Sequence, residues 1–441
     1  MAQSKHPLLK IIDLQKSGEA VGIYSACTAN EYVLRASLQR AKETNSYCLI
    51  EATANQVDQY GGYTGMKPAD FKKFVERLAQ EENIGMDRVI LGGDHLGPLT
   101  FAHLNEEEAM KEAKTLVHDY VRAGFSKIHI DTSMKVKDDD PNVRLTDETI
   151  ARRGAILAKV CEDAYLELLN EDPNALHPVY IIGSEVPIPG GSQDAKDTGV
   201  QVTKPEDFKA TYKAFEKAFN DNEVKDAFDY VIAIVVQPGV EEKDAGCTEY
   251  DRDKAIDLMN AIKEYPKLVF EGHSTDYQTK IKLREMVEDG VAILKVGPGL
   301  TYSAREALFA LSFIEDEVAT FKPIEKSNFR EVLDAEMLKN DKNWKKHYHG
   351  SAEEIAHKRK YSFSDRSRYY YTTEAVDAAV NKLLENLKEG CPLNLLSQFM
   401  PIQYTKVREG SLKNDPKELI VDRVGNTIDE YLYATHQKDL F

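Results

Sequence analysis

The sequence predicts a (β/α)8 barrel followed by a helical extension, and two observations lead to that fold class. Short runs of β-branched and apolar residues recur eight times along the chain, and each run ends in polar or acidic residues. Segments with the apolar spacing of amphipathic helices lie between most of these runs. Because barrel enzymes place their chemistry at the C-terminal ends of the strands, the polar residues are expected to converge on one mouth.

The predicted strands are Val21 to Ser25, Tyr47 to Glu51, Arg88 to His95, Lys127 to Asp131, Val179 to Glu185, Tyr230 to Gln237, Leu268 to His273 and Ala292 to Lys295. Helices are predicted over 7–17, 31–44, 68–82, 105–124, 146–170, 251–264, 276–288 and 302–320, with another starting near Thr203. Thr146 is the expected N-cap of the long helix that follows it, with Glu148 in its first turn.

The strand pattern stops near Pro323, which divides the chain into two predicted domains. Residues 1–322 form the catalytic barrel, and 323–441 form a helical extension with helices at about 373–389 and 416–434. The chain has 441 residues, whereas a typical barrel has roughly 250, so the chain is long enough for a barrel and one C-terminal extension. We expect the extension to cap the barrel, to form an oligomer interface, or both.

Composition narrows the functional class. With 42% apolar and 30% charged residues the chain is typical of globular proteins, and its net charge of −17 argues against a nucleic-acid binder. Five scattered cysteines without a CxxC motif argue against a disulfide framework or a cysteine-rich zinc site. No apolar signal core or membrane-length run is present, so we expect a cytoplasmic protein with no membrane partner.

The segment Leu91 to Pro98 is the sharpest local signal. Glycines flank Asp94 and His95 at a predicted strand end, so a ligand can approach the backbone closely. An imidazole can bind a divalent metal, and an adjacent acid can move a proton. The alternative for such a pair is a capping aspartate beside a buried histidine.

Two further strand ends supply possible metal ligands. Glu185 ends the fifth predicted strand, and His273 ends the seventh. Together with His95 they offer two imidazoles and a carboxylate, a set that suits a metal with open positions for substrate. Gln237, at the end of the sixth strand, is either a neutral oxygen ligand or a partner for a substrate hydroxyl.

The fourth and eighth strand ends extend this set of residues. Asp131 is a candidate acid, whereas His129 lies two positions deeper and is expected to be structural. Lys295 is followed by Gly297 and Gly299, a pattern that resembles the glycine-lined phosphate cradles of other barrels. A glycine turn that merely starts a helix is the alternative.

Loops after the second and fifth strands are expected to close over a substrate. Glu51 ends the second strand, and Gln56 and Tyr63 lie in the glycine- and hydroxyl-rich loop after it, which could equally be a rigid turn. The long loop from Gly190 to about Thr203 is the candidate lid. Arg366, Arg368 and the tyrosines at 369–371 are expected to form a packed aromatic face.

Long motifs resemble the Z subunits of tagatose-bisphosphate aldolase, proteins also labelled non-catalytic subunits or tagatose-6-phosphate kinases. They are Ile50 to Thr53, Asn55 to Val57, Gly61 to Met66, Gly92 to Pro98, Ala123 to His129, Val235 to Val240, Gly272 to Thr279, Leu294 to Gly299 and Tyr361 to Arg366. That family is similar in turn to zinc-dependent class II aldolases.

The resemblance implies roles for the residues that match. Asp94 would be the proton-transfer acid, and His95, Glu185 and His273 would bind the metal. Gln237 stands where the aldolases have another metal histidine, and Ser274 to Asp276 replace their glycine–serine phosphate loop. The implied cofactor is a divalent ion, zinc first, with manganese, cobalt or nickel as alternatives.

The function expected from this resemblance is 4-epimerisation of fructose and tagatose, or of their 6-phosphates, by retro-aldol chemistry. Asp94 with Asp131 or Asp276 would move protons, Glu51 is a further candidate acid, and Gln56, Tyr63, Gln237, Ser274, Lys295, Gly297 and Gly299 would bind the sugar. The alternative is a non-catalytic partner that stabilises a separate class II aldolase subunit, and a homo-oligomer is expected. A kinase is rejected because no GxxxxGK[ST] loop is present.

Overall fold

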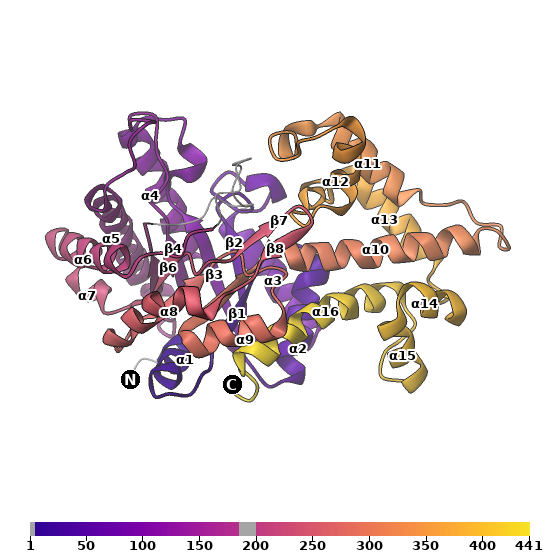
Figure 1. Cartoon of the computed structure of the whole chain (residues 1–441), viewed down its shortest axis with the longest axis horizontal. Coiled ribbons are helices and arrows are strands. Elements are labelled where there is room, and N and C mark those ends of the chain that lie inside the picture. Colours follow the sequence, from indigo (N-terminus) through magenta and orange to yellow (C-terminus); the bar gives the residue numbers. More distant parts are fainter. Residues whose placement is uncertain (1–4, 185–199) are drawn as a thin grey trace.

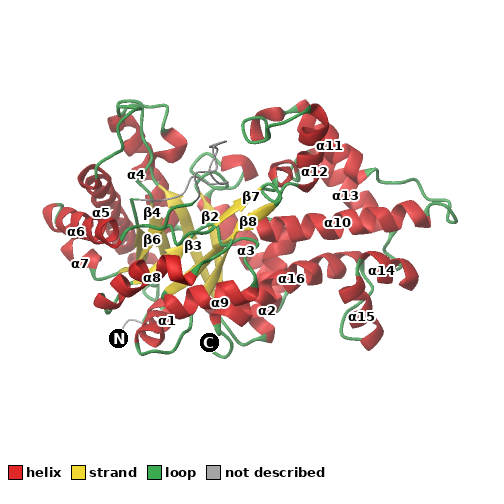
Figure 2. Cartoon of the chain, viewed as in Figure 1, coloured by secondary structure: helices red, strands yellow, loops and turns green. Residues whose placement is uncertain are grey.

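The computed structural model describes residues 5–184 and 200–441, and its centre is a closed barrel of parallel strands (Figures 1 and 2). Around the ring the strands are β1 (Ile23–Cys27), β2 (Cys48–Thr53), β3 (Val89–Leu96), β4 (Lys127–Ile130), β5 (Val179–Ile182), β6 (Val231–Val236), β9 (Val269–Gly272) and β10 (Val291–Val296). β10 pairs with β1 and closes the ring. The predicted fold class is confirmed.

Helices surround the barrel. They are α1 (Pro7–Lys16), α2 (Glu31–Glu43), α3 (Pro68–Glu81), α4 (Glu106–Arg122), α5 (Asp147–Glu171), α6 (Pro205–Asp221), α7 (Lys225–Phe228), α8 (Arg252–Ala261), α9 (Lys280–Asp289) and α10 (Pro298–Val318). Thr146 caps α5 as predicted. α9 begins later than expected because Thr279 is its N-cap, and α10 begins earlier because Pro298 occupies its first turn.

One feature of the barrel was not predicted. A two-stranded antiparallel hairpin, β7 (Glu241–Lys243) and β8 (Gly246–Thr248), follows β6. Its strands have three residues each, too few for a recognisable alternation of apolar and polar residues.

The region after residue 322 is helical and returns to the barrel. Its helices are α11 (Phe329–Lys339), α12 (Ala352–Tyr361), α13 (Glu374–Asn386), α14 (Leu393–Phe399), α15 (Pro401–Glu409) and α16 (Pro416–Thr435). α16 packs against α2, α9 and α10 (Figure 1). The amide of Gly22 donates to the carbonyl of Thr435 at 2.8 Å. The helical layer around the barrel therefore includes a helix from the C-terminal region. Among the described residues, no helix combines the length and apolarity needed to cross a membrane.

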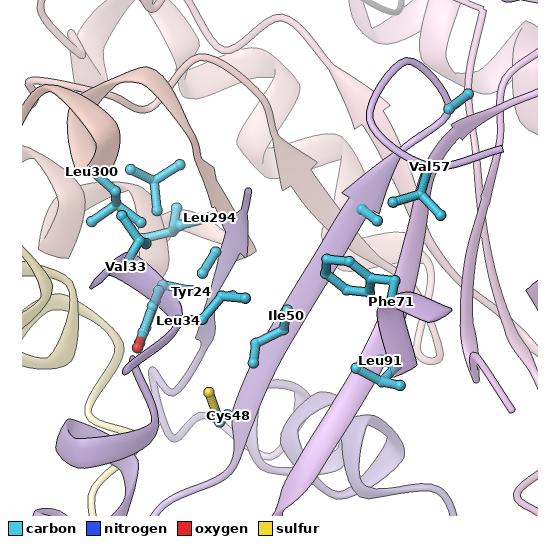
Figure 3. Close-up of a cluster of buried hydrophobic side chains, with 14 of the residues drawn as sticks. Tyr24, Val33, Leu34, Cys48, Ile50, Val57, Phe71, Leu91, Leu294 and Leu300 are labelled. Carbon is cyan, nitrogen blue, oxygen red and sulfur yellow. The ribbon is translucent and has the colours of Figure 1, made fainter. Parts of the chain in front are cut away.

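Two apolar layers stabilise the barrel. Inside it, strand residues such as Leu49 and Ile293 meet Leu8, Ile11 and Ile12 of α1, which covers the N-terminal end. Outside it, the opposite faces of the strands pack against the helices, as Ile50 and Phe71 do in Figure 3. Full burial of each such side chain contributes about 1.5–3 kcal/mol. The interior is apolar only at this end, so the polar side chains lie toward the other mouth.

Candidate active site

A layer of buried charges lies directly above the apolar floor of the barrel. Side chains two positions apart on a strand share a face, so Glu51 follows Leu49 into the interior, and Lys295 follows Ile293. The Lys127 ammonium lies 2.6 Å from Glu51 Oε1 and 2.7 Å from Glu271 Oε2. All of these charged side chains are at most 5% exposed.

Lys295 joins this layer to the mouth. Its Nζ lies 2.7 Å from Asp94 Oδ1 and 3.2 Å from Glu51 Oε2. Burial lowers the pKa of Lys295, but the carboxylates around it outweigh burial and raise it well above the usual value. Lys127 follows the same pattern, because Glu271 and Glu51 overcome the cost of burial and raise its pKa. Both lysines are therefore fixed cations.

Gly92 provides the space for Glu51. A Cβ atom at position 92 would lie 2.6 Å from Glu51 Cγ and 3.0 Å from its carboxyl carbon. Any larger residue at position 92 of β3 would displace the Glu51 carboxylate, which forms ion pairs with both Lys127 and Lys295. Gly92 thus serves the charged layer, whereas a Cβ atom at Gly93 would meet the side chains of Leu96 and Tyr120.

A bulge in β3 turns two consecutive residues toward the mouth. Gly93 pairs with Ile128 and Leu96 pairs with Ile130, so β3 has one residue more than β4 across this interval. His95 sits in the bulge with φ +51°, a left-handed conformation that is strained for a residue other than glycine. Neighbouring strand residues normally point to opposite faces, whereas here both Asp94 and His95 line the same cavity.

Three imidazoles meet at the floor of this cavity. The ring centroids of His95, His129 and His273 are 5.1–5.2 Å apart in every pairing. Each ring has a carboxylate partner. His95 Nδ1 lies 2.8 Å from Asp131 Oδ2, His129 Nδ1 lies 2.8 Å from Asp94 Oδ1, and His273 Nε2 lies 2.9 Å from Glu271 Oε1. Paired carboxylates orient the imidazoles at metal sites in this manner.

The donor set fits a divalent metal ion. One ligand atom from each of Asp94, His129, Glu271 and His273 lies within 4.8 Å of all the others. His129 Nε2 is buried and has no hydrogen-bond partner. Burial lowers the pKa of His273 to about 3, so its ring is neutral, as a metal ligand must be.

The charge balance supports the same conclusion. Four buried carboxylates, Glu51, Asp94, Asp131 and Glu271, lie among the two lysines and three imidazoles. With neutral imidazoles, the four carboxylates and two ammonium groups give this set a net charge of −2. Uncompensated buried charge is costly, and a divalent cation would balance this charge.

The predicted metal ligands fall in different places. His273 belongs to the cluster, and His95 touches it, with Nε2 3.6 Å from Asp94 Oδ2. Gln237 instead accepts hydrogen bonds from the amides of Gly239 and Val240 at 2.8 and 2.9 Å, which stabilises the turn after β6. Glu185 and most of the candidate lid, up to residue 199, lie outside the described residues.

Two members of the cluster are not among the predicted metal ligands. The sequence predicts a structural role for His129, and Glu271 is not one of the predicted site residues. Both lie two positions before a residue that was identified, Asp131 and His273, so the strand period places them on the same inward face. The two-residue period of the strands is therefore the feature of the sequence that could have identified His129 and Glu271 as site residues.

A cavity of about 110 Å³ lies above the cluster. Predicted residues that line it are Gln56, Tyr63, Asp94, His95, His273, Ser274, Asp276, Lys295 and Gly297, and those not predicted as site residues include Thr28, Asn55, Glu242, Arg368 and Tyr369. Glu51 and Asp131 are fully buried behind this lining. Most of the residues expected to bind a sugar therefore share one polar cavity.

The C-terminal region forms part of the cavity wall. The Tyr369 ring packs edge-on against Tyr63 with centroids 5.0 Å apart, and the Arg368 guanidinium lies 4.5 Å from the Tyr369 centroid. Burial raises the pKa of Tyr369, but Arg368 and Arg366 outweigh it and lower the pKa. The packed aromatic face expected here thus also lines the candidate site.

The amides of the predicted phosphate cradle have a hydrogen-bond partner within the chain. The amides of Gly297 and Gly299, at the start of α10, both donate to Asp276 Oδ1, at 3.0 and 2.7 Å. Burial and the nearby Glu242 raise the pKa of Asp276 to about 7, although these amides favour its ionised form. The group that accepts from the amides at this helix terminus is therefore a carboxyl group of the chain itself.

Comparisons with known proteins agree with this architecture. Residues 8–436 match the family described as D-tagatose-1,6-bisphosphate aldolase subunit GatZ/KbaZ-like. A crystal structure of a probable tagatose 6 phosphate kinase from Sinorhizobium meliloti 1021 is similar, with 41% identity and a TM-score of 0.84 over 94% of this chain and 100% of that one.

More distant likenesses are the YdjI aldolase from Escherichia coli K12 and a fructose-bisphosphate aldolase from Campylobacter jejuni. Their identities are 10% and 17%, with TM-scores of 0.41 and 0.42, over 84% and 86% of this chain and 94% and 91% of theirs. These two are too dissimilar to bear on function. The match over residues 8–436 shows that the chain belongs to the D-tagatose-1,6-bisphosphate aldolase subunit GatZ/KbaZ-like family.

Proposed function

We propose that this protein is a metal-dependent 4-epimerase that interconverts ketohexoses, or their 6-phosphates, of the fructose and tagatose type. The observation that carries the proposal is the cluster of Asp94, His129, Glu271 and His273 at the floor of a polar cavity. Together with the Lys295 ammonium beside Asp94, the cluster combines candidate metal ligands, an acid and a fixed cation, groups that can help to make and break a carbon–carbon bond beside a carbonyl.

The chemistry of the substrate selects the route. The C4 hydrogen of a 2-ketose is not adjacent to the carbonyl, so its direct removal gains no stabilisation. Loss of the C4 hydroxyl proton lets the C3–C4 bond break, with its electron pair delocalised toward the C2 carbonyl and an aldehyde left at C4. Rotation of the aldehyde and re-formation of the bond invert C4. Atoms and electrons balance without an external oxidant.

The proposed metal holders are His129, His273 and Glu271, while Asp94 faces both the cluster and the cavity. A divalent cation bound there would polarise the ketose carbonyl and stabilise the negative charge that develops as C3–C4 breaks. Imidazole nitrogens and carboxylate oxygens suit zinc first, with manganese, cobalt or nickel as alternatives. His95 would support the site from its place between Asp131 and the other rings.

Asp94 is the proposed group that removes the C4 hydroxyl proton. Burial raises the pKa of Asp94, but His95 and Lys295 outweigh it and hold the pKa well below the usual range. Asp94 is therefore ionised at neutral pH and able to accept a proton. Lys295, 2.7 Å away, keeps the carboxylate in place while its charge changes.

A second candidate function is that of a stabilising subunit for a separate class II tagatose-1,6-bisphosphate aldolase. The family description, which names its members as aldolase subunits, favours it. Kinase activity is not proposed, because the chain has no phosphate-binding GxxxxGK[ST] loop.

One assay separates the two candidates. The purified chain is incubated with fructose and with fructose 6-phosphate, with and without added divalent metal, and tagatose products are followed. Metal-dependent formation of tagatose or its 6-phosphate is expected. If no ketohexose or ketohexose phosphate is converted with any of the four metals, the epimerase proposal fails and the subunit role is favoured.

A further inference from the structure

Inversion at C4 needs proton transfer at two places in the cavity. Asp94, on the cavity floor, is the proposed acceptor of the C4 hydroxyl proton. When the aldehyde turns and the C3–C4 bond re-forms on its other face, the C4 oxygen points in a new direction and carries a negative charge. A second group, elsewhere in the lining, must give that oxygen a proton.

Tyr369 reaches this cavity from the C-terminal region. It lies in the 3₁₀ turn Arg366–Tyr370, and its ring packs edge-on against Tyr63 with centroids 5.0 Å apart. The Tyr63 amide in turn donates to the carbonyl of Asn55, another residue of the lining, at 3.0 Å. The phenol is therefore held in the wall by the loop that follows β2.

Two guanidinium groups hold the Tyr369 oxygen. Arg368 Nη2 donates to it at 3.0 Å, and Arg366 Nη1 donates to it at 3.2 Å. Guanidinium groups can only donate, so the oxygen is the acceptor in both hydrogen bonds and the phenol proton needs another partner. In the described part of the chain no group accepts that proton, so it is free for a ligand in the cavity.

The two arginines lack a negative partner of their own. Among the described residues neither guanidinium forms an ion pair with a carboxylate, although Arg366 is only 4% exposed. The Asp365 carboxylate, from the same turn, accepts instead from the hydroxyls of Thr301 and Ser367, both at 2.6 Å. Because unpaired buried charge is costly, both arginines favour a negative charge on the phenol oxygen that they already contact.

The other groups around Tyr369 leave this effect in place. Glu242 lines the same cavity and is attracted by Arg368, but burial outweighs this attraction and raises the pKa of Glu242, which favours its uncharged form. Burial also raises the pKa of Tyr63, to about 12. Burial raises the pKa of Tyr369 too, yet Arg368 and Arg366 outweigh it and lower the pKa. Of the two phenols in the lining, Tyr369 is the one that can give up its proton and regain it.

We propose that Tyr369 is the second proton-transfer group, which gives its phenol proton to the C4 oxygen after inversion. This inference rests on the proposed function and adds a catalytic residue to it. Asp94 gains one proton from the C4 hydroxyl, and Tyr369 loses one to the C4 alkoxide. Solvent returns a proton from Asp94 to the phenolate after the product leaves. The reverse reaction uses the same two groups with their roles exchanged.

The first test compares Tyr369→Phe with wild type and with Tyr433→Phe, a control at an exposed tyrosine of α16. Tyr369→Phe removes only the hydroxyl group. It should keep the metal content and the KM of wild type but lose at least about a hundredfold in kcat for tagatose formation, the scale of one acid–base group. Tyr433→Phe should turn over as wild type does.

The pH profile separates proton donation from support of the fold. Wild-type kcat/KM should fall as pH rises through the Tyr369 pKa, which lies below the ordinary 10.0, because the phenol has then lost the proton that it must give. Tyr369→Phe should lack this fall. A ring-fluorinated tyrosine at position 369 keeps the shape of the side chain, lowers the pKa of the phenol and should move the fall to lower pH.

Each outcome decides a different claim. Turnover by Tyr369→Phe near that of Tyr433→Phe, or an alkaline fall that remains in Tyr369→Phe, overturns the inference. An alkaline fall that disappears in Asp276→Asn or Glu242→Gln, and not in Tyr369→Phe, would assign the proton to that carboxyl group. If thermal melting shows that Tyr369→Phe does not fold, the fluorinated protein decides alone. A wild type without turnover refutes the proposed function, and the inference falls with it.

Discussion

At the scale of single residues, each imidazole on the cavity floor faces a carboxylate, and His129 keeps one nitrogen unpaired. We predict that His129→Ala and His273→Ala each lower bound metal at least about tenfold, since supporting groups at metal sites alone are worth 10–100-fold in affinity. Elemental analysis of protein purified without chelator measures this. His103→Ala, at an exposed histidine, is the control, and equal metal in all proteins would refute the assignment.

Asp94 tests the acid–base assignment. Asn keeps the shape and an oxygen atom but cannot accept the proton, so Asp94→Asn should fold and lose at least about a hundredfold in the rate of tagatose formation. Asp257→Asn, on the exposed side of α8, provides the matched control. Turnover near that of wild type would instead make Asp94 a structural partner of His129 and Lys295.

Asp276 gives a pH dependence with a definite sign. Its folded-state pKa of about 7 lies above the ordinary 3.8, so between these values the folded chain holds a proton that the unfolded chain has released. The free energy of unfolding therefore falls as pH rises through this window and levels off above about 7. The Asp276→Asn variant has no carboxyl group at this position, so its free energy of unfolding should not fall for this reason as pH rises.

Denaturant titrations of wild type and Asp276→Asn at pH 5 and pH 8 measure this effect. The variant should gain stability relative to wild type at the higher pH, with Asp257→Asn as the control. An unchanged difference between the two proteins would show that Asp276 has the same pKa in the folded and unfolded states.

Asp94, His95 and His273 line the cavity and could be predicted from the sequence, because they stand at strand ends, where barrel chemistry is expected. Contributions from distant parts of the chain could not be predicted in this way. Glu242 lies on a hairpin too short to be recognised, and Arg368 reaches the cavity from the C-terminal region. The hydrogen bond from the Gly299 amide of α10 to Asp276 could not be predicted either, because it depends on the folded conformation of the loop that carries Asp276.

At the scale of elements, all eight strands lie within a few residues of their predicted positions, because buried parallel strands show as short apolar runs bounded by polar residues. The β3 bulge could not be predicted, since it is defined by pairing with β4. The bulge shapes the candidate site, because it turns both Asp94 and His95 into the cavity.

The end of α16 offers an element-level prediction. Gln437 is 1% exposed, its Oε1 accepts from the Tyr24 amide at 3.3 Å, and its Nε2 donates to the Tyr47 carbonyl at 3.0 Å. Gln437→Ala leaves these buried groups unpaired and should lower the free energy of unfolding by about 1–3 kcal/mol. Lys438→Ala, exposed, is the control in denaturant titrations. Equal stability would mean that α16 needs no such attachment to β1 and β2.

At the scale of the whole molecule, the site is assembled from distant segments. Tyr63 from the barrel packs on Tyr369 from the C-terminal region, and Tyr431 of α16 holds the loop that carries Asp276. A polar cavity walled by side chains from distant segments suits a reaction whose fragments must stay bound until they recombine. Retention of both fragments would distinguish an epimerase from an aldolase with the same bond cleavage.

The last prediction follows from that distinction. If C4 is inverted by breaking and re-forming C3–C4, the hydrogen on C4 never leaves its carbon. Fructose or fructose 6-phosphate deuterated at C4 should then give product that keeps the deuterium at C4 in ordinary water, as measured by NMR or mass spectrometry. Removal of that hydrogen, or migration of the carbonyl, would wash out or move the label. Loss of deuterium from C4 would therefore rule out the retro-aldol route, while the metal and substrate proposals would remain open to their own tests.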